Sequence, residues 1–189
     1  MKAERGGEPP GRGASVLLVA RAQSGDRAAL EALLRAHQQP LYRHVRTITG
    51  DADLAFDVLQ SALLIVARRL GRLRDPRWFR AWAYRIATRE AVRAARRRSR
   101  YFSLFDEPAA LDDVAAEEVR VDPLLVRACA DRLAALPPAA EVTLRLHYLE
   151  EMSLIEIAEA LELPLGTVKS RLAYGLARLR EQLGPMLSG

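Results

Sequence analysis

Apolar residues recur every three or four positions in two blocks of this chain, residues 15–100 and 123–185, and the stretch between them shows no such period. This spacing places apolar side chains along one side of an α-helix. Both blocks favour strong helix formers such as Ala, Leu, Arg and Glu, and runs of β-branched residues are scarce. The sequence therefore predicts an all-α protein with two helical domains.

The composition of the remaining segments predicts the boundaries of these domains. Residues 1–14 hold Gly, Pro and charged residues without periodicity, and we expect them to be disordered. Residues 15–100 are predicted to form an N-terminal helical bundle. Residues 101–122 are predicted to form an acidic, flexible linker, and residues 123–185 a C-terminal bundle that contains a helix-turn-helix.

Capping residues mark several helix ends. Ser15 and Asp26 are candidate N-caps, and Gly50 is suited to end a helix. Asp75-Pro76 and Asp122-Pro123 pair a capping carboxylate with a proline at the first helical position, where its missing N–H costs nothing. Helices are expected from residue 15 onward and over 26–48, 51–70, 76–100, 124–136, 138–148, 153–161 and 165–183.

The expected helix over 51–70 is apolar on more than one side. Its apolar positions are Leu54, Val58, Leu59, Leu63, Ile65, Val66 and Leu70. A helix that is apolar over so much of its circumference either lies at the middle of a bundle or contacts a partner protein. The sequence leaves both alternatives open.

The charges are segregated along the chain. Residues 15–100 carry 18 basic and 7 acidic groups, residues 101–122 carry 1 and 7, and residues 123–189 carry 7 and 8. A solvated surface explains the number of arginines but not their segregation. A surface that binds a polyanion such as nucleic acid explains both.

Several classes of protein are disfavoured by what the sequence lacks. The single cysteine, Cys129, excludes a disulfide within the chain. No apolar run approaches the roughly 20 residues of a membrane span or forms a signal peptide, so we expect a cytoplasmic protein without membrane insertion. His37, His44 and His147 have no ligands at metal-binding spacing, and no Gly-rich phosphate loop follows a strand. We therefore expect no enzyme, metal, cofactor or small-molecule substrate.

Residues 152–172 have the outline of a helix-turn-helix. Ser153 and Glu156 form a capping-box pair, and Pro164 ends the first helix. Ile157, Ala158 and Leu161 give that helix its inner face. The inner face of the second helix is predicted to hold Val168, Leu172, Leu176, Leu179 and Leu183.

The second helix of this motif is predicted to direct polar side chains outward. They are Thr167, Lys169, Ser170, Arg171 and Tyr174, and they suit a helix that lies in the major groove of DNA. The alternative is an ordinary amphipathic hairpin with a solvated basic side. Residues 165–183 carry a net charge of +3 inside a block of net −1, and this favours DNA binding.

The C-terminal block resembles the promoter-binding domain of extracytoplasmic-function sigma factors. The resemblance lies in Leu136-Pro137-Pro138, in residues 146–158 and in Pro164-Leu-Gly-Thr-Val-Lys-Ser-Arg-Leu172. It implies that Thr167, Lys169, Ser170, Arg171, Tyr174 and Arg178 contact the −35 promoter element. Glu162 stands where that family often has a turn glycine, and Gly175 where basic residues are common.

The N-terminal block resembles the same family in two further segments. Ala55-Phe-Asp-Val-Leu-Gln60 resembles the helix that docks on RNA polymerase, which implies that Asp57, Val58, Gln60 and Ser61 bind the polymerase. Trp82-Ala-Tyr-Arg-Ile-Ala87 resembles the helix that engages the −10 element, and Gly71-Arg-Leu-Arg74 the loop that holds a flipped base. The implied contacts are Arg72, Arg74, Arg80, Trp82, Arg85 and Arg89, of which Arg89 stands where the family commonly carries Asn.

Arginines and aromatic residues are interleaved in this region. Residues 67–100 hold 13 Arg together with Trp78, Phe79, Trp82 and Tyr84, a composition typical of surfaces that bind single-stranded nucleic acid. Phe79 and Ile86 are expected in the core. For Trp82 a core position and a base-stacking position both stay open.

The resemblance implies a sigma factor that binds core RNA polymerase and promoter DNA and is held by an anti-sigma factor. The competing hypotheses are a stand-alone helix-turn-helix regulator, which usually binds a palindrome as a dimer, and an RNA-binding protein. The acidic linker is either a tether, a segment that threads toward the polymerase active-site cleft, or a cover over the Arg-rich helix in the free protein.

Overall fold

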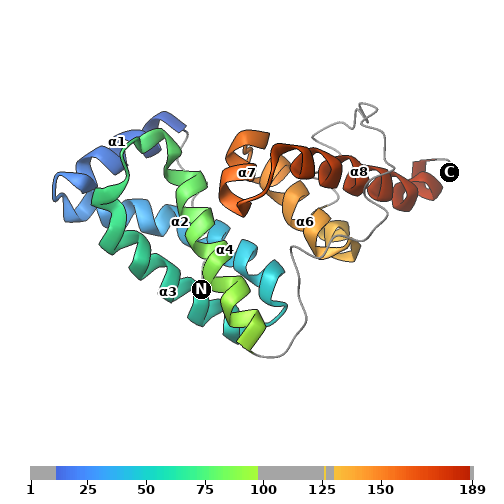
Figure 1. Ribbon diagram of the computed structural model, residues 1–189, viewed down its shortest axis with the longest axis horizontal. Helices are drawn as coiled ribbons and strands as arrows, with labels where there is room; N and C mark the ends of the chain where they lie inside the picture. The colour runs from blue at the N-terminus through green and yellow to red at the C-terminus, as the bar shows by residue number, and fades with distance from the viewer. Residues whose placement is uncertain (1–11, 98–125, 127–129, 188–189) are drawn as a thin grey trace, which may run out of the picture. The chain divides into compact units, whose positions relative to one another are not determined.

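The computed structural model describes residues 12–97, 126 and 130–187, and these residues form helices and turns without a strand (Figure 1). The all-α prediction is confirmed for this part of the chain. The chain divides into two compact units, residues 1–94 and 95–189. The predicted acidic linker, the Asp122-Pro123 start signal, the basic end at 98–100 and Cys129 lie outside the described residues.

The first unit contains four α-helices and two short 3₁₀ turns. They are α1 (Arg12–Gln23), α2 (Arg27–Thr49), α3 (Ala52–Arg69), η1 (Leu70–Arg72), η2 (Pro76–Trp78) and α4 (Phe79–Arg97). Asp26 caps α2 by accepting a hydrogen bond from the Ala29 amide, and Gly50 ends it with a left-handed φ of 66°. Asp51 and Asp75 cap α3 and η2 in the same way, so these predicted helix starts are confirmed.

The first helix begins earlier than predicted. Ser15 is not its N-cap: α1 starts at Arg12, which also places residues 12–14 in a helix where disorder was expected. The Ser15 side chain is buried. Adding a turn to an existing helix costs less free energy than starting one, so a helix can extend beyond its first apolar residue.

The core of this unit gathers side chains from all four helices. Its buried members are Val19, Leu33, Val66, Leu70, Phe79 and Ala83, with Trp82 and Ile86 half-buried against them. Phe79 is thus in the core as predicted, and Ile86 lies at its edge. Because each helix contributes to one cluster, the opposite sides of the helices remain available for other contacts.

A buried histidine joins α2 to α4. His44 Nε2 lies 2.8 Å from Thr88 Oγ1, whose hydroxyl donates to the Tyr84 carbonyl, so the imidazole Nε2–H donates to Thr88. Its ring also meets the edge of Tyr84 at a centroid distance of 5.0 Å. Burial lowers the pKa of His44 to about 3, so the imidazole is neutral near pH 7 and adds no charge to this unit.

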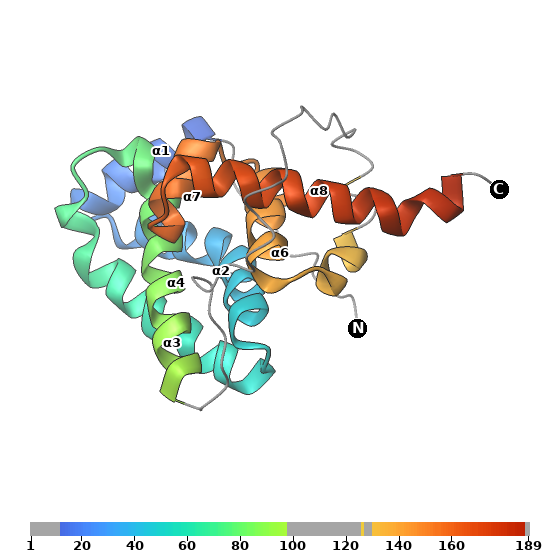
Figure 2. The ribbon, with the colours of Figure 1, turned by 45° about the vertical axis from the view of Figure 1, so that its right-hand side comes forward.

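The second unit is built around a long C-terminal helix. Its elements are η3 (Ala130–Ala135, a 3₁₀ helix), α6 (Pro138–Leu144), η4 (Arg145–Leu149, a π-helical turn), α7 (Leu154–Leu161) and α8 (Leu165–Leu187). Figure 2 shows α8 as one continuous helix. Ser153 and Glu156 form the predicted capping box, in which each side chain hydrogen-bonds to the backbone of the other residue.

The turn between α7 and α8 requires a left-handed residue. Glu162 takes this position with φ 56°, and its amide donates to the Ala158 carbonyl. This backbone conformation favours glycine. Glu162 therefore adopts this conformation at a strain cost of about 1 kcal/mol.

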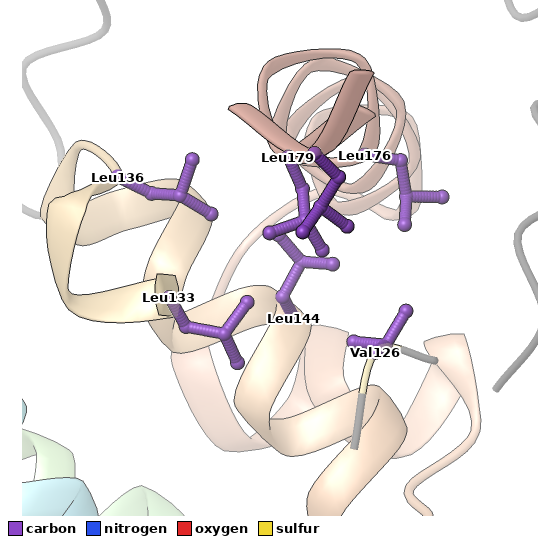
Figure 3. Close-up of a cluster of buried hydrophobic side chains, with 7 residues drawn as sticks. Val126, Leu133, Leu136, Leu144, Leu176 and Leu179 are labelled. Atoms are coloured by element: carbon purple, nitrogen blue, oxygen red, sulfur yellow. The ribbon is translucent and has the colours of Figure 1, made fainter. Parts of the chain in front are cut away.

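The core of the second unit lies between α8 and the helices before it. It consists of Val126, Leu133, Leu136, Leu144, Leu176, Leu179 and Leu183, and Leu144 points toward Leu176 and Leu179 (Figure 3). Val168 and Ile157 are also buried. The predicted inner face of the helix-turn-helix is thus confirmed for these positions, whereas Leu172 and Ala158 are only half-buried.

Gly175 allows α8 to cross close to α6. A Cβ at this position would lie 2.3 Å from Leu144 Cδ1 and 3.3 Å from Ala140 Cβ, and Leu144 is itself fully buried. The resemblance gives Gly175 as a position where basic residues are common. The structure places it in the interior, where any Cβ would require Leu144 to shift.

We predict that Gly175→Ala lowers the free energy of unfolding by about 1–2 kcal/mol, because overpacking outweighs the roughly 1 kcal/mol that alanine adds to a helix. Gly166→Ala is the matched control in the same helix, since a Cβ there meets nothing within 4 Å. It should be neutral or stabilising. Urea denaturation of both variants measures the difference, and equal stabilisation by both would contradict the close crossing.

Candidate nucleic-acid interface

One face of α8 carries four of the six residues predicted to contact the −35 element. Thr167, Ser170, Tyr174 and Arg178 follow each other at three- and four-residue spacing, so they lie in one line along the helix. Arg178 is exposed and the other three are half-buried. The structure therefore brings these four residues together on one accessible surface.

Arg178 is oriented by its neighbours on this face. Its Nε donates to the Tyr174 hydroxyl at 3.3 Å, and its guanidinium lies 5.6 Å from the centroid of the Tyr174 ring. Its Nη1 also forms an ion pair with Glu181 at 3.1 Å. The hydrogen bonds to Tyr174 and Glu181 raise the pKa of Arg178. The group is a fixed cation, and binding to phosphate would compete with Glu181.

Lys169 lies on another side of α8. It is exposed but precedes Ser170 by one position, which turns it about 100° around the helix axis. A helix that lies in the major groove contacts DNA on both sides of its central line. Lys169 is therefore suited to a phosphate or base at the edge of the contact rather than at its centre.

Arg171 does not point outward as predicted. Its exposed fraction is only 1%. It lies three residues after buried Val168 and four before buried Gly175, so the helical period places it at the margin of the apolar stripe. The prediction that Arg171 points outward is therefore wrong, and its contact with the −35 element stays a prediction.

A second basic face runs along α4. Trp82, Arg85 and Arg89, all predicted −10 contacts, share one side of the helix at three- and four-residue spacing. Arg93 and Arg96 continue this side and are exposed, although the sequence analysis did not single them out. We call these five residues the α4 basic face.

Arg80 does not belong to the α4 basic face. It lies two positions before Trp82, about 200° around the helix, and its side chain is half-buried. The prediction grouped it with the others because arginines are dense in this segment. Helix geometry separates it from them.

The four aromatic residues of this region have different environments. Tyr84 and Phe79 are buried in the core, and this excludes them from stacking on bases. Trp82 is half-buried, with its ring 6.3 Å from that of Phe79. Trp78 has an exposed fraction of 40% and is the aromatic side chain of this group that is most accessible.

The turn between α3 and α4 presents further arginines. Arg72 and Arg74, both predicted −10 contacts, are exposed. Arg77 is also exposed and pairs with Asp75, with Nη2 2.8 Å from Oδ2. The hydrogen bond from Arg77 and the cap to its amide lower the pKa of Asp75, so the cap stays ionised.

The predicted polymerase contacts lie on α3. Asp57, Gln60 and Ser61 are exposed on one side of it. Val58 is only 6% exposed and belongs to the interior, so it does not share the accessible surface of the other three, and its contact with polymerase stays a prediction.

Two apolar side chains extend the exposed side of α3. Phe56 and Leu64 are 50% and 56% exposed and stand four residues before and after Gln60. We call Phe56, Asp57, Gln60, Ser61 and Leu64 the α3 face. Exposed apolar groups arranged in a line are typical of a protein–protein contact. Of the two alternatives left open by the apolar circumference of this helix, the structure favours contact with a partner.

In the residues that the structure covers, no group of His, Cys, Asp and Glu side chains is arranged to hold a metal ion. Over the same residues, no helix has the length and apolar character needed to cross a membrane.

Comparison with known proteins shows the family of this chain. Residues 33–101 match the Sigma-70 region 2 family and residues 132–181 the Sigma-70 region 4 family. The chain is 34% identical to the ECF RNA polymerase sigma factor SigL of Mycobacterium tuberculosis over 167 residues, which cover 83% of this chain and 92% of SigL. This chain belongs to the extracytoplasmic-function family of RNA polymerase sigma factors. It is a transcription initiation factor that binds core RNA polymerase and promoter DNA, and a stand-alone regulator is not favoured.

Two further proteins support the assignment of this ECF sigma factor. The ECF RNA polymerase sigma factor SigW of Bacillus subtilis is 28% identical over 176 residues, or 87% of this chain and 94% of SigW. The structure of CnrH in complex with the cytosolic domain of CnrY matches with a TM-score of 0.62 and 25% identity, covering 91% of this chain and 98% of CnrH. The similarity thus extends over both units.

The burial of Arg171 predicts that Arg171 stabilises α8 of this ECF sigma factor, whereas exposed Lys169 binds the promoter. Arg171→Ala should lower the free energy of unfolding by about 1–3 kcal/mol, because it removes the packing contacts of an almost fully buried side chain. Lys169→Ala should leave stability unchanged and weaken promoter binding by the holoenzyme. The slope of log K against log salt should become shallower by about 1.

Thermal unfolding and salt-dependent binding to a promoter fragment measure the two effects. If Arg171→Ala kept its stability and lost promoter affinity, Arg171 would be a DNA contact after all.

Proposed function

We propose that this ECF sigma factor divides promoter opening among three surfaces. The outward face of α8 binds the −35 element as duplex, the α4 basic face with the preceding turn binds the melted −10 strand, and the α3 face docks on core polymerase. The observation that carries the proposal is that Trp82, Arg85 and Arg89 share one side of α4 while its apolar stripe is buried. The turn before α4 adds exposed Arg72, Arg74 and Trp78.

The α4 basic face suits a single strand for electrostatic and geometric reasons. Arginines along one side of a helix follow a phosphate backbone, and an accessible indole stacks on an unpaired base whatever its sequence. Trp78 is the accessible indole at the start of this face. We therefore add it to the −10 contacts implied by the sequence and remove Arg80 from the central group.

The α3 face suits a protein partner because it combines apolar and polar groups. Phe56 and Leu64 supply apolar area, and Asp57 and Gln60 supply hydrogen-bonding groups between them. Contacts with such a mixture give protein–protein interfaces their affinity and their orientation.

The similarity to CnrH supports a regulatory protein partner for this chain. CnrH was solved with the cytosolic domain of CnrY, and we infer that an anti-sigma factor holds this chain in a comparable way. We also infer that the protein acts in the cytoplasm, where core polymerase and promoters are found, and that catalysis belongs to the polymerase alone.

The α3 face predicts a loss of polymerase affinity in two variants. Phe56→Ser and Leu64→Ser should each raise the Kd for core polymerase about 10- to 100-fold, as expected when one large apolar side chain is no longer buried. Leu17→Ser is the matched control, because Leu17 is an apolar residue of α1 with a comparable exposure. Fluorescence anisotropy with labelled sigma factor measures the Kd. Equal effects of all three substitutions would contradict docking through α3.

The −10 surface predicts a loss specific to the melted strand. Trp78→Ala should weaken holoenzyme binding to a promoter fragment with a premelted −10 region by about 5- to 100-fold, because one stacking contact is lost. Binding to a duplex that carries only the −35 element should not change. Stability should also be unchanged, whereas Trp82→Ala should lower it because Trp82 packs against the core. Unchanged binding of Trp78→Ala to premelted DNA would refute the stacking role.

A further inference from the structure

The turn that precedes the α4 basic face is held by a side chain from the first helix. Gln23, the last residue of α1, donates from Nε2 to the Leu70 carbonyl at 3.0 Å and to the Leu73 carbonyl at 2.7 Å. One amide group thus bridges the two ends of the turn. We call residues 70–74 the η1 loop.

These two hydrogen bonds satisfy backbone groups that the end of α3 leaves without helical partners. The last carbonyls of a helix lack an intrahelical N–H and need a hydrogen-bond donor from elsewhere. Leu70 O accepts one bond from the Leu73 amide and a second from Gln23. Leu73 O accepts only from Gln23 among the bonds described for it. The conformation of the η1 loop therefore depends on this side chain.

Gln23 is exposed, but the turn that follows it in the chain is fixed by hydrogen bonds. Arg21 binds Asp26 with Nε at 2.9 Å and Nη2 at 2.6 Å, which closes the turn between α1 and α2. Asp26 also caps α2, and Gly25 takes the left-handed φ of 94° that the turn needs. Figures 1 and 2 both show α1 beside the turn that leads into α4.

The η1 loop has apolar residues inside and cations outside. Leu70 is buried in the core and Leu73 packs against it, while Arg72 and Arg74 are exposed. The positions of Leu70 and Leu73 are fixed by burial, but the backbone between and after them determines where the two guanidinium groups point. Gln23 contacts that backbone.

We infer that Gln23 is a positioning residue, which sets the conformation of the η1 loop and thereby the base preference of the sigma factor within the −10 element. The inference rests on the proposed function, in which this loop contacts the melted strand. Gln23 acts through the loop and needs no contact with DNA.

Gln23→Glu is the central variant because it keeps the shape of the side chain but replaces the donor with an acceptor that repels both carbonyls. Gln23→Leu removes the donor without adding charge. Gln23→Lys keeps a donor at a similar reach. Gln39→Glu is the matched control, because Gln39 is an exposed glutamine of α2 and the substitution adds the same charge.

The experiment uses holoenzyme assembled from core polymerase and the full chain. A promoter is selected by the wild-type holoenzyme from a library, and run-off transcription is then measured on every single-base substitution of its −10 and −35 elements. Gln23→Glu and Gln23→Leu should reduce discrimination at one or more −10 positions by about 3- to 10-fold, as expected for the loss of a positioning hydrogen bond. Preferences in the −35 element should not change. Gln23→Lys and Gln39→Glu should behave as the wild type.

Two further measurements separate positioning from general destabilisation. Hydrogen exchange at the amides of residues 71–74 should accelerate in Gln23→Glu and Gln23→Leu, while the thermal midpoint and the affinity for core polymerase stay close to those of the wild type. An equal loss of activity on all templates, or an effect of Gln23→Glu without one of Gln23→Leu, would overturn the inference.

Arg72→Ala and Arg74→Ala distinguish this inference from the proposed function. If both variants keep the wild-type −10 preference, the η1 loop does not contact the strand and the proposed function fails at this surface. If either changes the preference while Gln23→Glu and Gln23→Leu do not, the loop contacts DNA but Gln23 does not position it.

Discussion

Each helix of this sigma factor must bury one apolar stripe, and this constraint decides which of its charged residues can reach DNA or polymerase. On α4 the buried stripe leaves Trp82, Arg85 and Arg89 together on one accessible side. On α8 the same constraint turns Arg171 inward beside Val168 and Gly175. The nucleic-acid surfaces are therefore consequences of packing, and a residue type alone does not identify a contact.

The structure of the C-terminal unit also depends on the close approach of two helix backbones. Gly175 lets Leu144 fill the space where a Cβ would stand, so α8 lies directly against α6. Glu162 adopts a left-handed conformation at the end of α7, in the turn that leads into α8. Together they hold the outward face of α8 in a fixed orientation, and a recognition helix needs this because base contacts are geometrically demanding.

In the N-terminal unit, hydrogen bonds from polar side chains fix segments that the apolar core does not fix. The core fixes Leu70 and Phe79 on either side of the turn before α4, but it does not fix the backbone between them. Hydrogen bonds from Gln23 do so. The buried pair of His44 and Thr88 joins α2 to α4 by a similar bond, with the imidazole neutral because burial opposes its charge.

The sequence by itself determined the helical class, the starts of α2, α3 and η2 and the capping box at Ser153, because caps and periodic spacing are local signals. The family followed from the resemblance of its motifs. It also correctly placed Asp57, Gln60 and Arg89 at the surface. Only the tertiary structure decided that Val58, Arg171 and Tyr84 are enclosed, that Phe56, Leu64 and Trp78 are exposed, and that Gly175 is a packing site. These facts depend on which neighbour covers each side of a helix, and residues far apart in the sequence provide that cover. The bond from Gln23 to Leu73, fifty residues away, has no local signal at all.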